Sequence, residues 1–358
     1  MSKYEKTFFI LFFISLFSIS GIAQTKSVNV DNFAFTYAYR GFPVKPLDPI
    51  RFNYAVRINA AAVVKNYVSV EEIADILKIQ GQAKVDDPAD ASVIVELTLG
   101  NIIVSSSGVN ERKVESKDKE GKVTGTTYFY SVTAKYTFES SYKITNGQKL
   151  LTGSAIYSRN STEVYQSKEY GTRTAAADYW NNNREALIVD FYRNLVISSA
   201  NTVSNQASVL YGFPTYTNVR DLLKTMNEKK HDENTTFREA INSVKTELQA
   251  MTPDIPLDKE KLTDVIEYLK SLPAKYNTAS KADIRMRYLA YYNLGKIYYY
   301  LDEPENVKQY ADLIAPNGYD EKDGGKLNKA ADELMNSFNK IGIRTQHFSP
   351  DDYFNSEQ

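Results

Sequence analysis

The side chains that most often carry catalysis are scarce in this 358-residue chain, and none stands in a recognisable catalytic motif. There are two histidines, His231 and His347, and both lie in polar stretches that we expect to be exposed. No serine occupies a Gly-x-Ser-x-Gly elbow, and neither a His-Glu-x-x-His zinc motif nor a phosphate-binding loop occurs. The sequence therefore identifies no catalytic residue and favours a function without catalysis.

Metal binding has one faint signal, the acidic run from Asp320 to Gly324. This run lacks the Asp-x-Asp-x-Asp-Gly spacing and the later glutamate of a calcium loop. The chain also contains no cysteine, which excludes both thiolate metal sites and a disulfide framework. We therefore expect neither a bound metal nor a cofactor.

Tyrosine is unusually frequent, with 27 Tyr against 17 Phe. A tyrosine can bury its ring while its hydroxyl stays hydrated or hydrogen-bonded, so the excess is typical of a core with many half-buried edges. The same side chains could instead form a platform for a carbohydrate or a peptide. Two carboxylates that meet across a fold leave no spacing signature. An exported hydrolase or carbohydrate-binding protein that uses Tyr and carboxylate side chains therefore stays open as the alternative.

The first 23 residues have the three-part plan of a secretory signal peptide. Lys3 and Lys6 precede an apolar run from Phe8 to Phe17, and Gly21 and Ala23 are small residues suited to signal peptidase. We predict cleavage after Ala23, with no integral membrane segment in the remaining chain. Export of a chain without cysteine favours the periplasm or the outer-membrane periphery of a Gram-negative bacterium. The net charge of only −1, without a long run of one sign, predicts no nucleic-acid partner.

The chain up to about residue 160 reads mainly as strands, because apolar and polar side chains alternate along it. The apolar positions include Phe33, Phe35, Tyr37 and Tyr39, then Tyr54, Val56 and Ile58, and then Val93, Val95, Leu97 and Leu99. Ser69 and Glu72 form a capping box before a short helix, and helical spacing follows from Asn183 to about Leu210. These patterns predict an α+β domain over residues 24–214, with an antiparallel-rich sheet and packed helices.

The clearest strand runs from Thr127 to Ile144 and leads into the hairpin signal Asn146-Gly147. We expect Gln148–Ser158 to return antiparallel to it, with Tyr142 opposite Leu151. The side chains expected to face the core are Tyr136, Phe138, Tyr142, Leu151 and Tyr157. The charged stretch 105–127 before this strand predicts a long solvated hairpin tip that turns near residues 118–121, although a recognition loop stays an alternative.

The rest of the chain has helical spacing, and residues 215–346 are predicted to form an all-α domain. The apolar positions expected to be buried are Val219, Leu222, Leu223 and Met226, then Phe237, Ile241, Val244 and Leu248, then Leu262, Val265, Ile266 and Leu269, and finally Leu327, Ala331, Leu334, Phe338 and Ile341. Two longer helices are expected between them, from about Lys281 to Leu301 and from Pro304 to about Gly318. Residues 347–358 read as a flexible polar tail.

One stretch of this helical region resembles the first helix of a tetratricopeptide (TPR) repeat. Tyr291 matches the large aromatic, Leu294-Gly295 the Leu-Gly pair and Tyr298 the following tyrosine, while the second helix matches less well. The resemblance covers residues 288–316, about one repeat, and implies helical hairpins of the TPR kind. It also implies that the inner face of the first helix binds ligand. On this chain the implied binding residues are Tyr292, Asn293, Lys296 and Tyr299.

The expected function is that of an exported, non-enzymatic envelope protein that acts as a protein-interaction or scaffold module. Its expected partner is another protein of the cell envelope. For the implied binding face there is a structural alternative, in which Tyr292 and Tyr299 pack against a neighbouring element.

Overall fold

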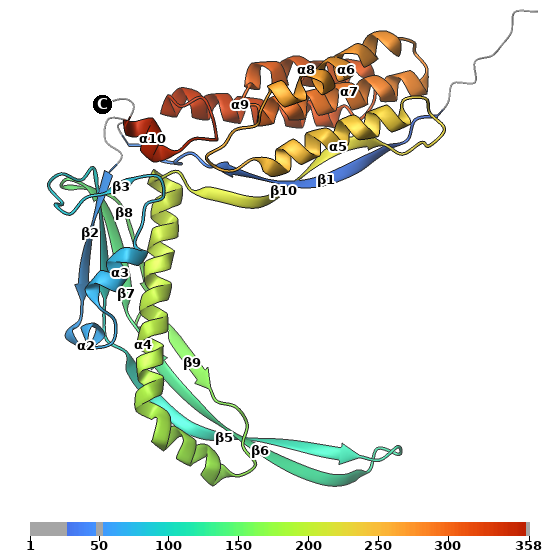
Figure 1. Ribbon diagram of the computed structural model, residues 1–358. Helices are drawn as coiled ribbons and strands as arrows, with labels where there is room; N and C mark the ends of the chain where they lie inside the picture. The colour runs from blue at the N-terminus through green and yellow to red at the C-terminus, as the bar shows by residue number, and fades with distance from the viewer. Residues whose placement is uncertain (1–26, 48–52, 356–358) are drawn as a thin grey trace, which may run out of the picture. The chain divides into compact units, whose positions relative to one another are not determined.

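The computed structural model describes residues 27–47 and 53–355, and its fold class is α+β, as the sequence predicts (Figure 1). The predicted signal peptide, residues 1–23, lies outside the described residues. The described chain forms two compact units. We call residues 27–38 and 217–339 the helical unit, and residues 39–47, 53–216 and 340–355 the sheet unit.

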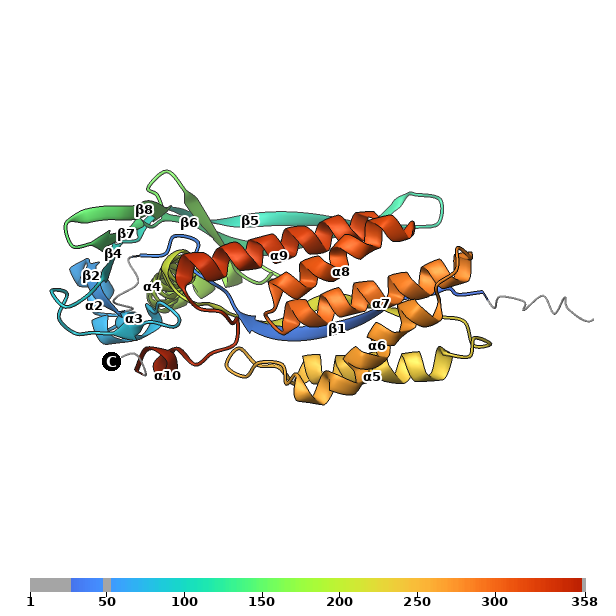
Figure 2. The same cartoon turned by 90° about the horizontal axis from the view of Figure 1, so that it is seen from above.

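The sheet unit is built on a five-stranded mixed sheet with the order β3-β2-β4-β7-β8. Its strands are β2 (Asn53–Ala60), β3 (Ala83–Lys84), β4 (Val93–Leu99), β7 (Ser140–Asn146) and β8 (Lys149–Tyr157). Strand β2 is parallel to β3 and β4, whereas β4, β7 and β8 are successively antiparallel. The order leaves β8 at one edge of the sheet, and Figure 2 shows it at the far end of the row from β2.

Helices cover one face of this sheet. They are α2 (Ala62–Lys65), α3 (Val70–Ile76) and the 39-residue α4 (Arg173–Tyr211), which begins ten residues before the predicted start. Ser69 caps α3 by accepting a hydrogen bond from the backbone of Glu72, as the capping box predicts. The alternating apolar side chains of β4 and β7 pack against α4, while Arg57 and Glu96 form a 3.7 Å ion pair on the other face. The sheet therefore has one buried and one polar face.

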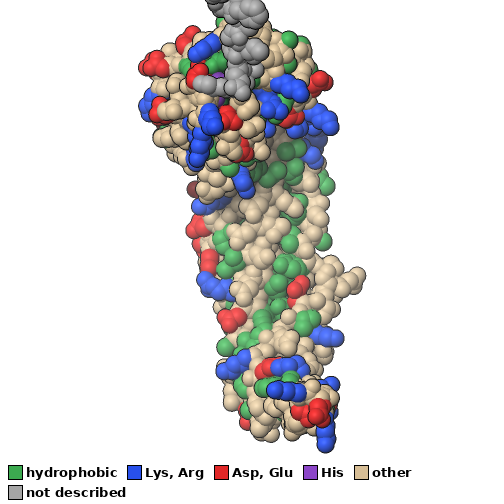
Figure 3. All heavy atoms as spheres, turned by 90° about the vertical axis from the view of Figure 1, so that its right-hand side faces the viewer, with side chains coloured by type: hydrophobic (Ala, Val, Ile, Leu, Met, Phe, Trp, Pro, Cys, Tyr) green, Lys and Arg blue, Asp and Glu red, His purple; other side chains and the backbone are tan. Residues whose placement is uncertain are grey.

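A second sheet in the same unit has three strands, β5 (Ile103–Lys117), β6 (Val123–Thr137) and β9 (Thr162–Gln166). Strands β5 and β6 form a long hairpin, and the Gly121 backbone donates to Asp118 in its turn, where the sequence predicts it. Residues 115–127 are exposed throughout. Figure 3 shows basic and acidic side chains together at the lower end of this unit, where the hairpin ends. The stretch is therefore a solvated hairpin tip, as expected.

The predicted hairpin at Asn146-Gly147 exists, but its register is wrong. Residues 127–144 do not form one strand, because the chain leaves β6 at Thr137 and enters β7, in the other sheet, at Ser140. The turn lies one residue later than predicted and a bulge follows at Leu151, so Tyr142 pairs with Ser154 instead of Leu151. The five side chains predicted to face the core are nevertheless buried or half-buried in it. They keep their face because the turn shifts the pairing by an even number of residues and β-bulges re-aim the remaining side chains.

The C-terminal residues are not a flexible tail as far as they are described. Residues 350–355 form helix α10 (Pro350–Asn355), while His347 and Phe348 are buried. Phe348 packs edge-on against Phe213 at 5.3 Å between ring centroids, and Arg40 donates to the backbone oxygens of both residues. The prediction failed because the polar neighbours of Phe348 hid one large aromatic anchor, which is sufficient to hold the segment in a small core of its own.

The helical unit contains five long helices and parts of two strands. The helices are α5 (Asn234–Ala250), α6 (Thr263–Lys275), α7 (Lys281–Tyr300), α8 (Pro304–Asn317) and α9 (Lys322–Ile341), and the 3₁₀ turn η1 (Glu260–Leu262) lies directly before α6. The strands are β1 (Val30–Arg40) and β10 (Thr215–Met226). Strands β1 and β10 pair in a two-stranded sheet. The prediction of a helix at Val219–Met226 is therefore wrong, because pairing with β1 overrides the helical spacing. The proposed boundary at residue 214 also misplaces residues 27–38, which belong with the helices.

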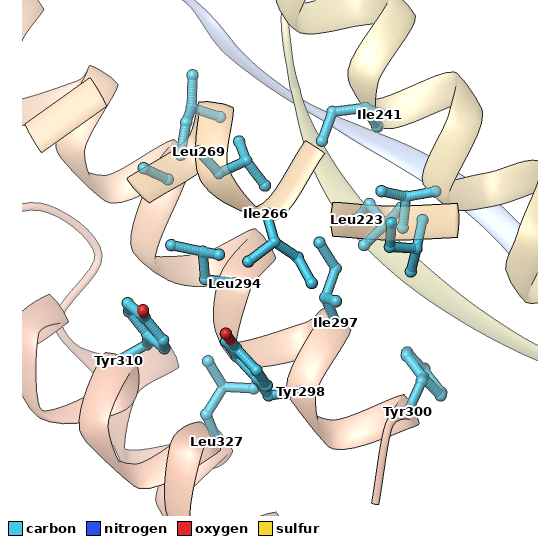
Figure 4. Close-up of a cluster of buried hydrophobic side chains, with 14 of the residues drawn as sticks. Leu223, Ile241, Ile266, Leu269, Leu294, Ile297, Tyr298, Tyr300, Tyr310 and Leu327 are labelled. Atoms are coloured by element: carbon cyan, nitrogen blue, oxygen red, sulfur yellow. The ribbon is translucent and has the colours of Figure 1, made fainter. Parts of the chain in front are cut away.

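One apolar core holds the helical unit together, and the side chains labelled in Figure 4 come from α5 to α9 and from β10. The stripes predicted for α5 and α9 are buried, with Ile241 and Leu327 as examples. Tyr298 and Tyr310 stack with centroids 5.5 Å apart, joining α7 to α8. A Cβ at Gly295 would lie 3.0 Å from Leu327, so this glycine lets α9 approach α7 closely. The helical hairpin α7–α8 thus has the boundaries that the sequence predicts.

Candidate functional site

The four binding residues implied by the TPR resemblance lie on the side of α7 that meets β10. Asn293 is fully buried, and its amide exchanges hydrogen bonds with the backbone N–H and C=O of Lys224, both at 2.9 Å. The Tyr292 hydroxyl points toward the Leu222 carbonyl at 3.5 Å, and the Lys224 ammonium lies 5.2 Å from the centroid of its ring. These contacts fasten α7 to the strand.

The other two implied binding residues take part in the same junction. The Lys296 ammonium forms an ion pair with Asp221 of β10, and Tyr300 donates its hydroxyl proton to the same carboxylate. The ring of Tyr299 packs edge-on against Tyr300 at 5.3 Å. The polar groups of Asn293 and Lys296 are therefore occupied by β10, which is the packing alternative to a free ligand-binding face.

A second buried polar cluster surrounds Asp323, at the start of α9. Its carboxylate accepts a 2.7 Å hydrogen bond from the Tyr288 hydroxyl and another from Lys326, and it lies 3.7 Å from the Lys224 ammonium. Burial acts to raise the pKa of Asp323, but the bonds from Lys326 and Tyr288 outweigh it and hold that pKa below its usual value. Burial and the Asp323 charge together raise the pKa of Tyr288. Among the described residues no group of carboxylates or histidines could hold a metal ion.

A third polar cluster surrounds Glu233, just before α5. Its carboxylate accepts hydrogen bonds from Tyr268 at 2.7 Å and Tyr276 at 3.3 Å, and it pairs with Lys275. Burial alone would raise the pKa of Glu233, yet these donors lower it below the usual range. His231, expected to be exposed, is buried beside this cluster, with its ring 5.7 Å from that of Tyr276. All three clusters are thus internally paired, which is typical of structural polar networks.

The sheet unit, by contrast, has open hollows between strand β8 and the last turns of α4. The larger hollow has a volume of about 530 Å³, and the smaller one about 440 Å³. Lys45 lines both hollows, so they adjoin. Side chains of the larger hollow include Lys45, Tyr142, Thr152, Asn205, Val209 and Leu210. Side chains of the smaller hollow include Asn146, Lys149, Leu150, Leu151 and Tyr211. We call these two hollows together the β8–α4 groove, and its size is that of ordinary ligand sites.

The main chain forms one end of this groove by running along the last turn of α4. Val44 and Lys45 donate their backbone N–H groups to the carbonyls of Val209 and Leu210, at 3.1 and 2.8 Å. These bonds satisfy carbonyls that the end of a helix leaves open. Large apolar side chains are exposed around the groove, and Leu150 is the extreme case with 60 % of its surface accessible. Exposed apolar side chains that cluster beside a cavity are typical of interaction surfaces.

The polar groups of the groove are not matched to one another. None of its lining residues is acidic, and neither Lys45 nor Lys149 forms an ion pair with any described residue. Tyr211 is only 2 % exposed, yet its hydroxyl has no hydrogen-bond partner among the residues that the structure describes. A buried hydroxyl without a partner costs about 1–3 kcal/mol, so such groups are rare in folded proteins. Two lysines without ion-pair partners beside one hollow indicate a place for a ligand with acceptor groups.

Sequence reasoning did not find this groove. Its lining comes from three segments, residues 45–47, 142–152 and 205–211, which are distant along the chain. The available signal was local, namely Leu150 and Leu151 directly after a hairpin turn and Val209 on the exposed side of a helix. Neither position reveals that β8 is an edge strand, because strand order follows from the whole topology.

Comparisons with known proteins do not identify the chain. No protein-family model matches it, and no curated protein matches it significantly. Among solved structures it is similar to a crystal structure described as a neuraminyllactose-binding hemagglutinin homologue from Helicobacter pylori. That match has 11 % identity and a TM-score of 0.19, and it covers 47 % of this chain and 95 % of the other. A likeness this slight carries no argument about function.

Proposed function

We propose that this protein is an exported, non-enzymatic interaction module of a bacterial envelope, and that the β8–α4 groove receives a segment of another envelope protein. The observation that carries the proposal is the groove itself, an apolar hollow of several hundred Å³ beside the edge strand β8. A protein segment that binds beside an edge strand gains binding energy by filling apolar pockets and by pairing with groups that have no partner in the empty site.

The groove favours binding over hydrolysis. A carboxylate-based hydrolase needs two acidic groups that converge on a substrate, and no acidic side chain lines the groove. Two of the buried carboxylates with lowered pKa values, Asp323 and Glu233, are each held by a lysine and by at least one tyrosine hydroxyl. Such pairing stabilises the ionised form and leaves the carboxylate little capacity to exchange a proton.

The proposed address depends on the N-terminal sequence pattern, in which two lysines, an apolar run and small residues follow one another. Within the part of the chain that the structure describes, no helix combines the length and the apolar character that crossing a bilayer requires. Mass spectrometry of the mature N-terminus tests the address. A chain that begins at Gln24 supports export, whereas an intact Met1 on a membrane-bound protein contradicts cleavage.

The test of the function places a photo-crosslinking amino acid at Val209 or Leu150, one at a time, in the full chain in the organism that makes it. Both side chains are exposed and line the groove. Leu313 on α8 is a matched control, because it is also apolar and exposed but belongs to the helical unit.

We expect adducts from both groove positions to map to one continuous segment of a second protein. The Leu313 control should give no such adduct. Equal labelling from Leu313, or no adduct from either groove position, would contradict the proposed function.

A further inference from the structure

We infer that the partner segment binds in an extended conformation, as an additional strand on the free edge of β8, and that it carries acidic side chains. This inference rests on the proposed function, since it states which chemistry the groove selects. It follows from three features of the described residues: the edge of β8, the apolar floor of the groove and the unpaired lysines at its rim.

The edge of β8 is open for backbone pairing. Strand β8 pairs with β7 along one side only, and no described segment pairs with its other side. The ladder is regular from Thr152 to Ala155, between one bulge near Leu151 and another near Ile156. Natural edge strands are commonly protected by proline, by charged side chains or by bulges; Leu150–Tyr157 contains no proline and no charge, and its two bulges lie on either side of Thr152–Ala155. The unpaired N–H and C=O groups of this stretch can therefore receive another strand.

The groove beside this edge fits the side chains of an added strand. Successive side chains of a strand point to opposite faces, so every second residue of the partner would point toward α4. The floor on that side is formed by Tyr142 from the neighbouring strand and by Val209 and Leu210 from the helix. These three side chains suit an apolar residue of moderate size, so the segment should alternate apolar residues with others.

The lysines at the rim of the groove favour a partner segment with negative charge. Lys45 lines both hollows and Lys149 begins β8, and neither forms an ion pair with a described residue. Since no acidic side chain lines the groove, an acidic segment would meet complementary charge, whereas a basic one would be repelled. Together, the open edge, the apolar floor and the lysines predict an extended partner segment in which apolar and acidic residues alternate.

The experiment uses synthetic eight-residue peptides that are acetylated and amidated, with the full mature chain as receptor. One peptide alternates Glu and Val, a second alternates Lys and Val, and a third is the Glu/Val peptide with every second backbone nitrogen methylated. Binding is measured by fluorescence anisotropy at low salt, and amide hydrogen exchange is followed at Thr152–Ala155.

We expect the Glu/Val peptide to bind at least about tenfold more tightly than the Lys/Val peptide, because the rim is cationic. Methylation should weaken binding by about tenfold or more, since it removes the donors of a new ladder. The Glu/Val peptide should also slow amide exchange within Thr152–Ala155. Equal binding of the methylated peptide would overturn strand addition, and equal binding of the Lys/Val peptide would overturn the acidic preference.

Two double variants provide the matched control. Lys45→Glu with Lys149→Glu should reverse the order of the Glu/Val and Lys/Val peptides, because both lysines line the groove. Lys119→Glu with Lys122→Glu makes the same change of charge at the exposed tip of the β5–β6 hairpin, and it should leave the order unchanged. An unchanged order in the groove variant would overturn the assignment of the acidic side chains to this rim.

The peptide experiments can fail while the crosslinking test of the proposed function succeeds, so the two proposals are tested separately. Failure of all three peptides, together with persistent crosslinks from Val209, would overturn strand addition by an acidic segment and leave a groove that binds partners in another way. Loss of the crosslinks as well would contradict the groove as a binding site altogether.

Discussion

The polar clusters around Asn293, Asp323 and Glu233 in the helical unit differ from the lysines and the tyrosine hydroxyl of the β8–α4 groove in whether their polar groups have partners among the described residues. Asp323, Asn293 and Glu233 each accept or donate several hydrogen bonds inside the helical unit. In the sheet unit, the Tyr211 hydroxyl has no hydrogen-bond partner and the Lys149 ammonium has no ion-pair partner among the described residues. Buried polar groups that are paired with one another stabilise a fold, whereas unpaired polar groups beside a hollow are available to bind a ligand. The residues suggested by the family resemblance belong to the first kind.

The largest test of this contrast is Asp323→Ala. The change removes the carboxylate that faces the Lys224 ammonium and the Tyr288 hydroxyl. Among the described residues it leaves them only the weaker acceptors Asn32 and Asp320, so we expect a loss of about 3 kcal/mol in the free energy of unfolding. Urea denaturation measures it. Lys326→Ala is the control, because its side chain is 75 % exposed and its bond to Asp323 should contribute at most about 1 kcal/mol. Similar effects of the two changes would mean that the cluster is not a structural network.

The second test is Asn293→Ala, which removes the amide that joins α7 to β10. Three hydrogen bonds are lost, and the backbone groups of Lys224 lose their partner, so we expect a destabilisation of about 2–3 kcal/mol. Thermal and urea unfolding both measure it. If unfolding is unchanged while partner capture is lost, then Asn293 is a ligand contact, and the face implied by the TPR resemblance regains its support.

The third test is the dependence of stability on pH. The folded-state pKa values of Asp323 and Glu233 lie below their usual values, so both carboxylates stabilise the fold fully above their unfolded pKa values. That stabilisation is lost as the pH falls through the folded-state values. We therefore expect the free energy of unfolding to fall from about pH 5 downward, and less steeply in Asp323→Asn. Parallel pH profiles for the variant and the parent protein would show that Asp323 does not contribute.

The smallest expected effect is that of Tyr211→Phe, and its sign is opposite. Removing a buried hydroxyl that has no partner should leave the free energy of unfolding unchanged or raise it by up to about 1 kcal/mol. Tyr288→Phe is the matched control, since the same atom is removed from a hydroxyl that donates to Asp323 and the protein should be destabilised. A clear destabilisation by Tyr211→Phe would mean that its hydroxyl is paired, and the contrast between the two regions would disappear.

Sequence periodicity predicted those elements whose pattern and packing agree. The apolar stripe of α5, from Phe237 to Leu248, is buried as expected, because a helix with one apolar face has only one way to bury it. The spacing of Val219, Leu222, Leu223 and Met226 also fits a helix, yet these residues form β10. These residues form a strand because they pair with β1, which lies far away in the N-terminal part of the chain. The local sequence pattern of β10 does not reveal this pairing.

The candidate site was beyond sequence reasoning for a related reason. Helical spacing correctly placed the helices α7 and α8, but which side of α7 meets another element depends on β10, which was predicted as a helix. The groove depends on strand order and on a missing hydrogen bond at Tyr211, and both are properties of the assembled fold. A polar residue in a sequence does not show whether it will find a partner.

The pairing of β1 with β10 has a consequence for how the chain matures. A chain synthesised from its N-terminus presents β1 first, but β10 follows only after most of the sheet unit. The contact order of this pair is therefore high, and pairs of high contact order form slowly because a long loop must close first. Until then β1 is a solitary strand with Phe33, Phe35 and Tyr37 uncovered, which makes it a target for chaperones and a starting point for aggregation during folding.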